Sequence, residues 1–175
     1  MAAAIPGPAL AGLQRHLDGL AGHFPEARWT DETSRHITLK FLGSTPAGRL
    51  PEVERRCGAA ASGAEPCELR FEGLGAFPRP ARATVLWAGV GGDRGKLTQL
   101  AGGLDDALAP MGFRSEQRPF VAHATLARFR QPVRLELPEL SPIGPFPVTQ
   151  MALLQSHLSP RGARYTALAT FPLGR

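Results

Sequence analysis

The feature that most constrains this chain is a duplicated tetrapeptide. The segments 36–39 and 123–126 both read His-x-Thr-Leu, and each lies in a run where polar and apolar residues alternate. Side chains alternate between the two faces of a β-strand, so the histidine and the threonine of each copy project from one face. The duplication therefore predicts two strands that each present an imidazole beside a hydroxyl: His36 with Thr38, and His123 with Thr125.

A single His-x-Thr carries little information, because threonine favours strands and a lone histidine is usually structural. This chain has only five histidines, however, and two of them fall into the same pattern. Two such strands facing one cleft would form a paired-histidine site with two hydroxyl donors. That combination is suited to phosphoryl chemistry without a metal ion.

The spacing of the motifs indicates how the chain is organised. The two histidines are 87 residues apart, about half of the 175-residue chain. This predicts an α+β fold in which residues 1–175 form one domain of two pseudo-symmetric lobes. Each lobe would hold an antiparallel sheet and outer helices, with the active-site cleft between the lobes.

Periodicity predicts the individual elements. Leucines at helical spacing predict helices over about 8–21 and 97–108, and Thr45-Pro46 is expected to cap a third over about 46–61. Alternation predicts strands over 35–42, 67–72, 83–90, 120–129, 148–155 and 163–171. The proline-rich stretch 131–147 is expected to hold at most a short edge strand near Leu135 and Leu137, and residues 159–162 are expected to turn a hairpin. Alanines at 2–4 predict a short first strand.

Composition places limits on the class of protein. No apolar stretch is long enough to span a bilayer, and residues 1–14 carry no positive side chain, unlike a signal peptide. Cys57 and Cys67 form no Cys-x-x-Cys pair, which favours a reducing cytoplasm and no structural zinc. The net charge of +5, mostly arginine, permits a polyanionic partner but does not require one.

Several catalytic classes lack their sequence motifs. There is no His-Glu-x-x-His, no Gly-x-Ser-x-Gly and no phosphate-binding P-loop. We therefore expect neither a metal nor an organic cofactor, and no obligate protein partner is inferred.

The motif segments resemble the 2H phosphoesterase superfamily, and within it the RNA 2′,3′-cyclic phosphodiesterases first described as 2′-5′ RNA ligases. The resemblance extends over almost the whole chain in the family's order, through residues 36–43, 73–78, 85–90, 118–123 and 156–160. It implies the same bilobal fold and hydrolysis of an RNA terminal 2′,3′-cyclic phosphate to a 2′-phosphate. It also implies that His36 is the proton donor and His123 the proton acceptor. The residues themselves leave those two roles interchangeable.

Three further residues are candidates for substrate binding. Lys40 has the strand parity of His36, so it could reach the phosphate, although a solvated lysine is the simpler interpretation. Arg128 has the opposite parity to His123, yet the family has an arginine at this offset, and a bulge near the strand end would turn it inward. Phe41 could stack on a base, although its parity with Ile37 and Leu39 favours the core.

Three functions stay open at this stage. The first is a metal-independent cyclic phosphodiesterase acting on RNA ends, with reverse 2′-5′ ligation expected from microscopic reversibility. The second is a non-catalytic module that binds nucleotides or RNA ends. The third is a phosphodiesterase for a small cyclic nucleotide or a 2′-5′ oligoadenylate, since the motif residues contact only the phosphate.

Overall fold

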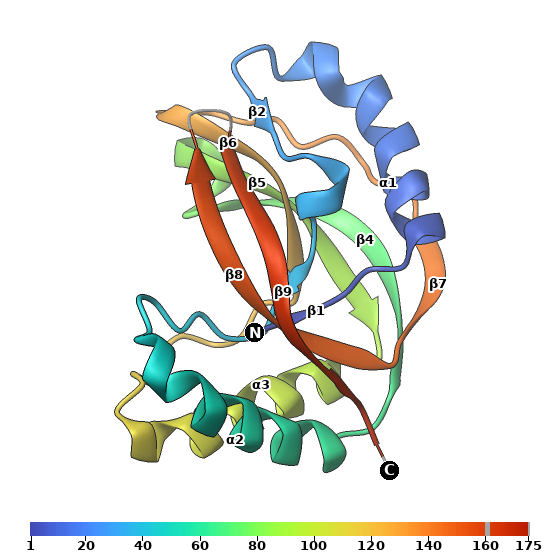
Figure 1. The fold of residues 1–175 in the computed structure, drawn as a ribbon. Helices are drawn as coiled ribbons and strands as arrows, with labels where there is room; N and C mark the ends of the chain where they lie inside the picture. Colours follow the sequence, from blue (N-terminus) through green and yellow to red (C-terminus); the bar gives the residue numbers. More distant parts are fainter. Residues whose placement is uncertain (160–161, 175) are drawn as a thin grey trace.

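Nine strands pair into one antiparallel sheet in the computed structural model, which describes residues 1–159 and 162–174 (Figure 1). The sheet has the order β7-β4-β5-β6-β3-β1-β8-β9, and β2 pairs with β6 outside this path. The strands are β1 Ala2–Ala3, β2 Arg28–Trp29, β3 Ile37–Thr38, β4 Cys67–Phe77, β5 Ala83–Gly92, β6 His123–Val133, β7 Ile143–Val148, β8 Gln150–Ser159 and β9 Gly162–Pro172.

The two histidine motifs occupy the middle of this sheet. Strands β7, β4, β5 and β6 lie on one side of the β3–β6 boundary, and β3, β1, β8 and β9 lie on the other. The predicted α+β fold with antiparallel halves is confirmed. The halves are joined through the pairing of β3 with β6, so they form one continuous sheet.

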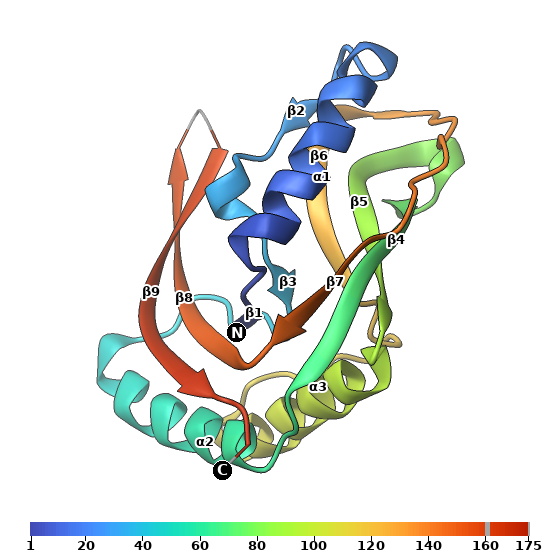
Figure 2. The same ribbon diagram turned by 90° about the vertical axis from the view of Figure 1, so that its right-hand side faces the viewer.

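Three helices cover the sheet with apolar stripes. They are α1 Gly7–Leu20, α2 Leu50–Ser62 and α3 Arg94–Leu108, each close to its predicted range. Helices α1 and α2 both have a proline in the first turn, where the backbone N–H is not needed for a helical hydrogen bond. Helices α2 and α3 pack side by side, with α2 against β8 and β9 and α3 against β4 (Figure 2). Short 3-10 turns occupy Ala21–His23, Glu32–Ser34, Ala47–Arg49, Pro80–Arg82 and Ala109–Met111. No helix in the described part of the chain is both long and apolar enough to cross a membrane.

The structure differs from the sequence-based elements in two places. The first motif forms a regular strand only over Ile37–Thr38, although the N–H groups of Leu39 and Lys40 still donate to the Met1 carbonyl. The proline-rich segment forms its strand at Ile143–Val148 and not at 135–137. Strand β7 pairs only with β4, so Pro145 and Pro147 can lie in an edge strand whose N–H groups are not all required. The hairpin is confirmed by the pairing of Ser159 with Gly162, while its expected tip, 160–161, lies outside the described residues.

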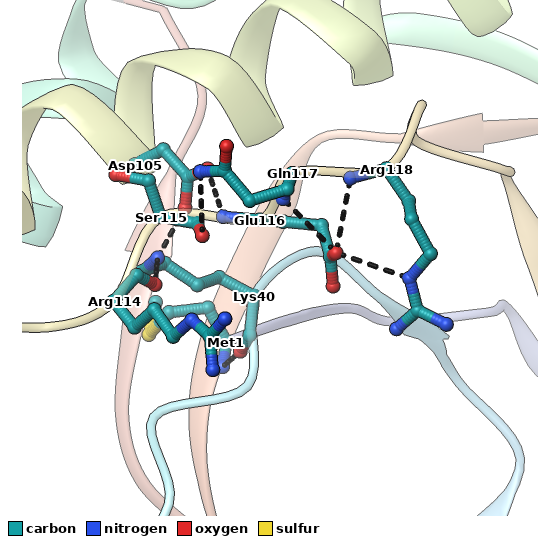
Figure 3. A network of polar contacts seen from close by, with 8 residues as sticks. All are labelled: Met1, Lys40, Asp105, Arg114, Ser115, Glu116, Gln117 and Arg118. Atoms are coloured by element: carbon teal, nitrogen blue, oxygen red, sulfur yellow. Dashed lines mark hydrogen bonds and ion pairs between the residues drawn. The ribbon is translucent and has the colours of Figure 1, made fainter.

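A buried ion pair connects the end of the first motif strand to the loop that precedes the second. Lys40 is 6% exposed, and its ammonium contacts Asp105 of α3 and donates to the Arg114 carbonyl at 3.0 Å (Figure 3). The other oxygen of Asp105 accepts the Glu116 N–H at 3.0 Å. One carboxylate therefore holds both the strand end and the 114–116 loop.

We expect Asp105→Ala to destabilise the fold by about 2–3 kcal/mol. Removing one partner of a buried pair costs about 3–5 kcal/mol, and the partial exposure of Asp105 reduces this. Asp106→Ala, at an exposed neighbouring position of α3, is the matched control. Urea unfolding of both variants checks this expectation, and equal midpoints for the two would contradict it.

Candidate active site

The pairing of β3 with β6 sets the geometry of the site. Ile37 lies opposite Ala124, so in this antiparallel register His36 lies opposite Thr125, and Thr38 lies opposite His123. Ile37 and Ala124 are fully buried on the core face, which leaves the four motif side chains on the other face. The histidines are diagonal neighbours, which corresponds to about 7–8 Å between Cα atoms.

The backbone orients both imidazoles in the same way. Nδ1 of His36 lies 2.9 Å from the Ser34 carbonyl oxygen, and Nδ1 of His123 lies 2.7 Å from the Val121 carbonyl oxygen. A carbonyl can only accept, so in both histidines Nδ1 carries the proton that it donates. Nε2 is then the nitrogen that exchanges protons, and both histidines can act through it.

Each imidazole also packs against an aromatic ring of a strand that is not its direct neighbour in the sheet. The His36 ring lies edge-on to Tyr165 of β9, with centroids 4.6 Å apart, and the His123 ring lies edge-on to Phe77 of β4 at 5.0 Å. Trp87 of β5 adds a second ring 5.8 Å from His123. These contacts restrict the rotation that the carbonyl hydrogen bonds leave open.

Burial makes both histidines weaker bases than in water. Desolvation lowers the pKa of each below its usual 6.5, while the hydrogen bond to the backbone carbonyl partly opposes this shift. The positive charge of Arg128 lowers the pKa of His123 further. The pKa of His36 is lowered further by the positive charge of the N-terminal ammonium and then by that of His123. Both imidazoles are therefore mainly neutral at pH 7 in the free protein.

A β-bulge brings Arg128 to the site. On β6, Thr125 pairs with Trp87 and Ala127 with Leu86, so Leu126 is an extra residue that reverses the parity beyond it. Burial follows this change: Leu126 and Ala127 are both buried, and Arg128 is exposed on the side of His123 and Thr125. The hydroxyl of Thr30 donates toward the carbonyls of Thr125 and Leu126 at 3.0 Å, which satisfies the backbone at the bulge.

A cavity of about 590 Å³ opens beside the motif residues. His36, Thr38 and Thr125 line it, together with residues of β2, the start of β9 and the end of β6. Three arginines, Arg28, Arg128 and Arg130, point into it from β2 and β6, against one carboxylate, Asp31. None of the described residues forms an ion pair with these arginines, so the cavity has an excess of positive charge that favours an anionic ligand.

Two of the three candidate binding residues lie elsewhere. Lys40 does not line the cavity, because its ammonium is engaged by Asp105, and it is buried where a solvated lysine was the simpler expectation. Phe41 does not line the cavity either, and at 83% exposure it is not a core residue, so the interpretation from parity is wrong. Parity fails at both residues because the regular strand ends at Thr38.

The sequence analysis gave no site role to Arg35, which precedes the first motif histidine. Arg35 is 6% exposed, and its guanidinium donates to the Thr30 carbonyl at 2.8 Å and to Gln14 of α1 at 2.7 Å. It therefore fixes β2 and α1 relative to His36. An arginine beside a motif residue gives no sequence signal that would separate this role from phosphate binding.

Across residues 1–159 and 162–174, no group of three or more histidine, cysteine or carboxylate side chains is arranged to hold a metal ion.

Comparisons with known proteins show the family of this chain. The family model for LigT-like phosphoesterases matches residues 5–87 and 91–165. An RNA 2′,3′-cyclic phosphodiesterase of Aeropyrum pernix is 34% identical over 163 residues, which is 89% of this chain and 92% of the relative. A protein of the same name from Archaeoglobus fulgidus is 33% identical over 166 residues, 90% of this chain and 88% of the relative.

Solved structures show the same fold. The Thermus thermophilus protein TT0787 superposes with a TM-score of 0.83 at 28% identity, covering 98% of this chain and 95% of that one. Escherichia coli LigT complexed with 3′-AMP superposes with a TM-score of 0.79 at 26% identity, covering 99% and 96%.

The bulge generates a prediction about His123. Arg128→Ala should raise the pKa of His123, because a nearby positive charge is removed, and should change the pKa of His36 less. Titration of the imidazole resonances by NMR measures both. The control is Arg82→Ala, which removes an exposed arginine that does not line the cavity. An unchanged His123 midpoint would mean that Arg128 does not act on this ring.

Proposed function

This chain belongs to the LigT-like phosphoesterase family and is an RNA 2′,3′-cyclic phosphodiesterase. We propose that it opens the cyclic phosphate to a 2′-phosphate by a two-histidine acid/base mechanism. The observation that carries the mechanism is the antiparallel pairing at Ile37 and Ala124. It sets two imidazoles on a diagonal, each directly opposite a threonine, on one open face of the sheet.

The arrangement suits in-line displacement at phosphorus. One neutral imidazole accepts a proton from water through Nε2, and the attacking oxygen forms a bond to phosphorus. The P–O3′ bond breaks on the far side, and the other imidazole, protonated, gives its Nε2 proton to the 3′ oxygen. Thr38 and Thr125 donate hydrogen bonds to the non-bridging oxygens, and Arg128 balances their charge.

The charge of Arg128 supports one assignment of the two roles. It favours the neutral form of His123, which is the form that a general base needs. His36 then acts as the general acid. The negative charge that develops on the bound phosphate in the transition state favours the protonated form of His36. We therefore propose His123 as proton acceptor and His36 as proton donor.

The arginines of the cavity favour an RNA end over a small cyclic nucleotide. Arg28 lies opposite Arg128 in the β2–β6 register, and Arg130 lies two residues further along β6. A cyclic mononucleotide has one phosphate and needs one cation, whereas a strand entering along β6 brings several. A cytoplasmic location stays part of the proposal, supported by the buried free thiols of Cys57 and Cys67.

Reverse ligation follows from the same geometry. If a 5′-hydroxyl takes the place of water, its attack gives a 2′-5′ phosphodiester and a free 3′-hydroxyl. The same two histidines would transfer the protons.

The main test is turnover of a short RNA that ends in a 2′,3′-cyclic phosphate, with EDTA present. We expect a 2′-phosphate product, and we expect His36→Ala and His123→Ala each to lower kcat/KM by about 10²- to 10⁴-fold, because each removes a proton-transfer group. His23→Ala, at an exposed position in a 3-10 turn, is the control. Tight binding of the RNA with no product would favour the non-catalytic binding module, and near-full activity of either motif variant would refute the mechanism.

A second test separates RNA from a small nucleotide as substrate. Arg28→Ala should raise KM for the RNA several-fold and reduce the slope of log KM against log salt by about 1, because one phosphate contact is lost. It should leave KM for a nucleoside 2′,3′-cyclic monophosphate almost unchanged. Arg82→Ala makes the same charge change outside the cavity. Equal effects on both substrates would favour the small cyclic nucleotide.

A further inference from the structure

A second cavity, of about 760 Å³, lies beside residues 120–122, which precede His123, and shares no lining residue with the arginine-lined cavity. We infer that it binds the nucleoside that carries the attacking hydroxyl, at the 5′-hydroxyl end of an RNA acceptor. This inference rests on the proposed function, because it concerns the second substrate of the same site. The walls of the cavity come from β4, β5, the first turns of α3 and residues 120–122.

Its position follows from the register of β5 with β6. Trp87 pairs with Thr125 and Gly89 pairs with His123, so Trp87 and Gly89 lie on the same face of the sheet as the motif side chains. Residues 120–122, which immediately precede His123, line this cavity, whereas Thr125, which follows it, lines the first. The link between the second cavity and the proposed general base is Trp87, which lines this cavity and whose ring lies 5.8 Å from the His123 ring.

The floor of the cavity is an aromatic plane with polar groups at its margin. The Trp87 indole lies across Gly75, where any Cβ would overlap the ring, and the Glu72 carboxylate lies over Gly91 in the same way. Phe120 supplies a second aromatic ring, and Thr98 and Gln99 of α3 supply a hydroxyl and an amide. Aromatic faces stack on any base, and groups of this kind hydrogen-bond to base edges.

The charges of the two cavities differ in a way that assigns the two RNA ends. The first holds three arginines and one aspartate, which fits a strand ending in phosphate. The second holds one arginine, Arg94, and one carboxylate, Glu72, and that carboxylate already accepts from Arg70 at 2.7 Å. A balanced, aromatic cavity fits an uncharged terminal nucleoside with a free 5′-hydroxyl.

The resulting reaction is balanced. His123 Nε2 accepts the proton of the 5′-hydroxyl, the O5′–P bond forms, and the P–O3′ bond breaks. His36 Nε2 gives a proton to O3′, so the products are a 2′-5′ phosphodiester and a 3′-hydroxyl. An acceptor seated in the second cavity would approach phosphorus from the His123 side, which is the side of the proposed base.

The test measures joining and hydrolysis in one reaction. The full chain is incubated with a short RNA ending in a 2′,3′-cyclic phosphate and an excess of a 5′-hydroxyl dinucleotide, and the ratio of 2′-5′-joined to hydrolysed product is determined. Gln99→Trp fills the cavity and should lower this ratio at least tenfold. Asp106→Trp, exposed two turns further along α3 and outside the cavity, should keep the wild-type ratio.

The outcomes separate the inference from the proposed function. Hydrolysis without joined product at saturating acceptor, or an equal ratio in wild type and Gln99→Trp, would overturn the inference and leave the phosphodiesterase intact. A fall in Gln99→Trp that Asp106→Trp matches would also overturn it. Absence of hydrolysis by the wild type would refute both. Thr98→Trp, a second exposed position in the cavity wall, should reproduce the effect of Gln99→Trp.

Discussion

The site depends on one short antiparallel contact, in which Ile37 pairs with Ala124 at the centre of the sheet. This pairing brings together two motifs that are half a chain apart, and it converts the two-residue period of each strand into a square of four functional side chains. A contact this short needs support from outside the strands. Asp105 holds Lys40 and the 114–116 loop on one side, and Thr30 and Arg35 hold the bulge and β2 on the other.

The two motifs are similar but not equivalent, and the bulge at Leu126 is the reason. Beyond Thr125 the extra residue turns Arg128 toward the phosphate site, whereas beyond Thr38 the regular strand ends and Lys40 turns inward to an ion pair. The bulge therefore places a guanidinium beside His123, whereas the cation beyond Thr38, Lys40, is paired with Asp105. The near-twofold arrangement of the motifs supplies two histidines that can transfer protons, His36 and His123. The bulge at Leu126 breaks this symmetry and gives the two histidines different surroundings.

The sequence was most informative where a period could be read over several residues. Leucine stripes located α1 and α3, and a proline cap located α2. The alternation in both motifs put His36, Thr38, His123 and Thr125 on a common face, in agreement with the register of β3 with β6. Parity arguments failed for Lys40 and Phe41, because they assume a regular strand that ends before those residues. Arg128 could be expected only through the family offset, since a bulge has no signature in composition. The role of Arg35 and the second cavity arise from contacts between distant segments, which no local pattern encodes.

The way in which both imidazoles are held affects how such a site can evolve. Nδ1 is fixed by main-chain oxygens, those of Ser34 and Val121, and not by an aspartate or glutamate side chain. A substitution at Ser34 or Val121 keeps the carbonyl acceptor unless it changes the path of the backbone. The side chains at these two positions are therefore free to vary. No carboxylate is therefore required to orient either imidazole. A search for orienting acidic partners would overlook sites of this construction.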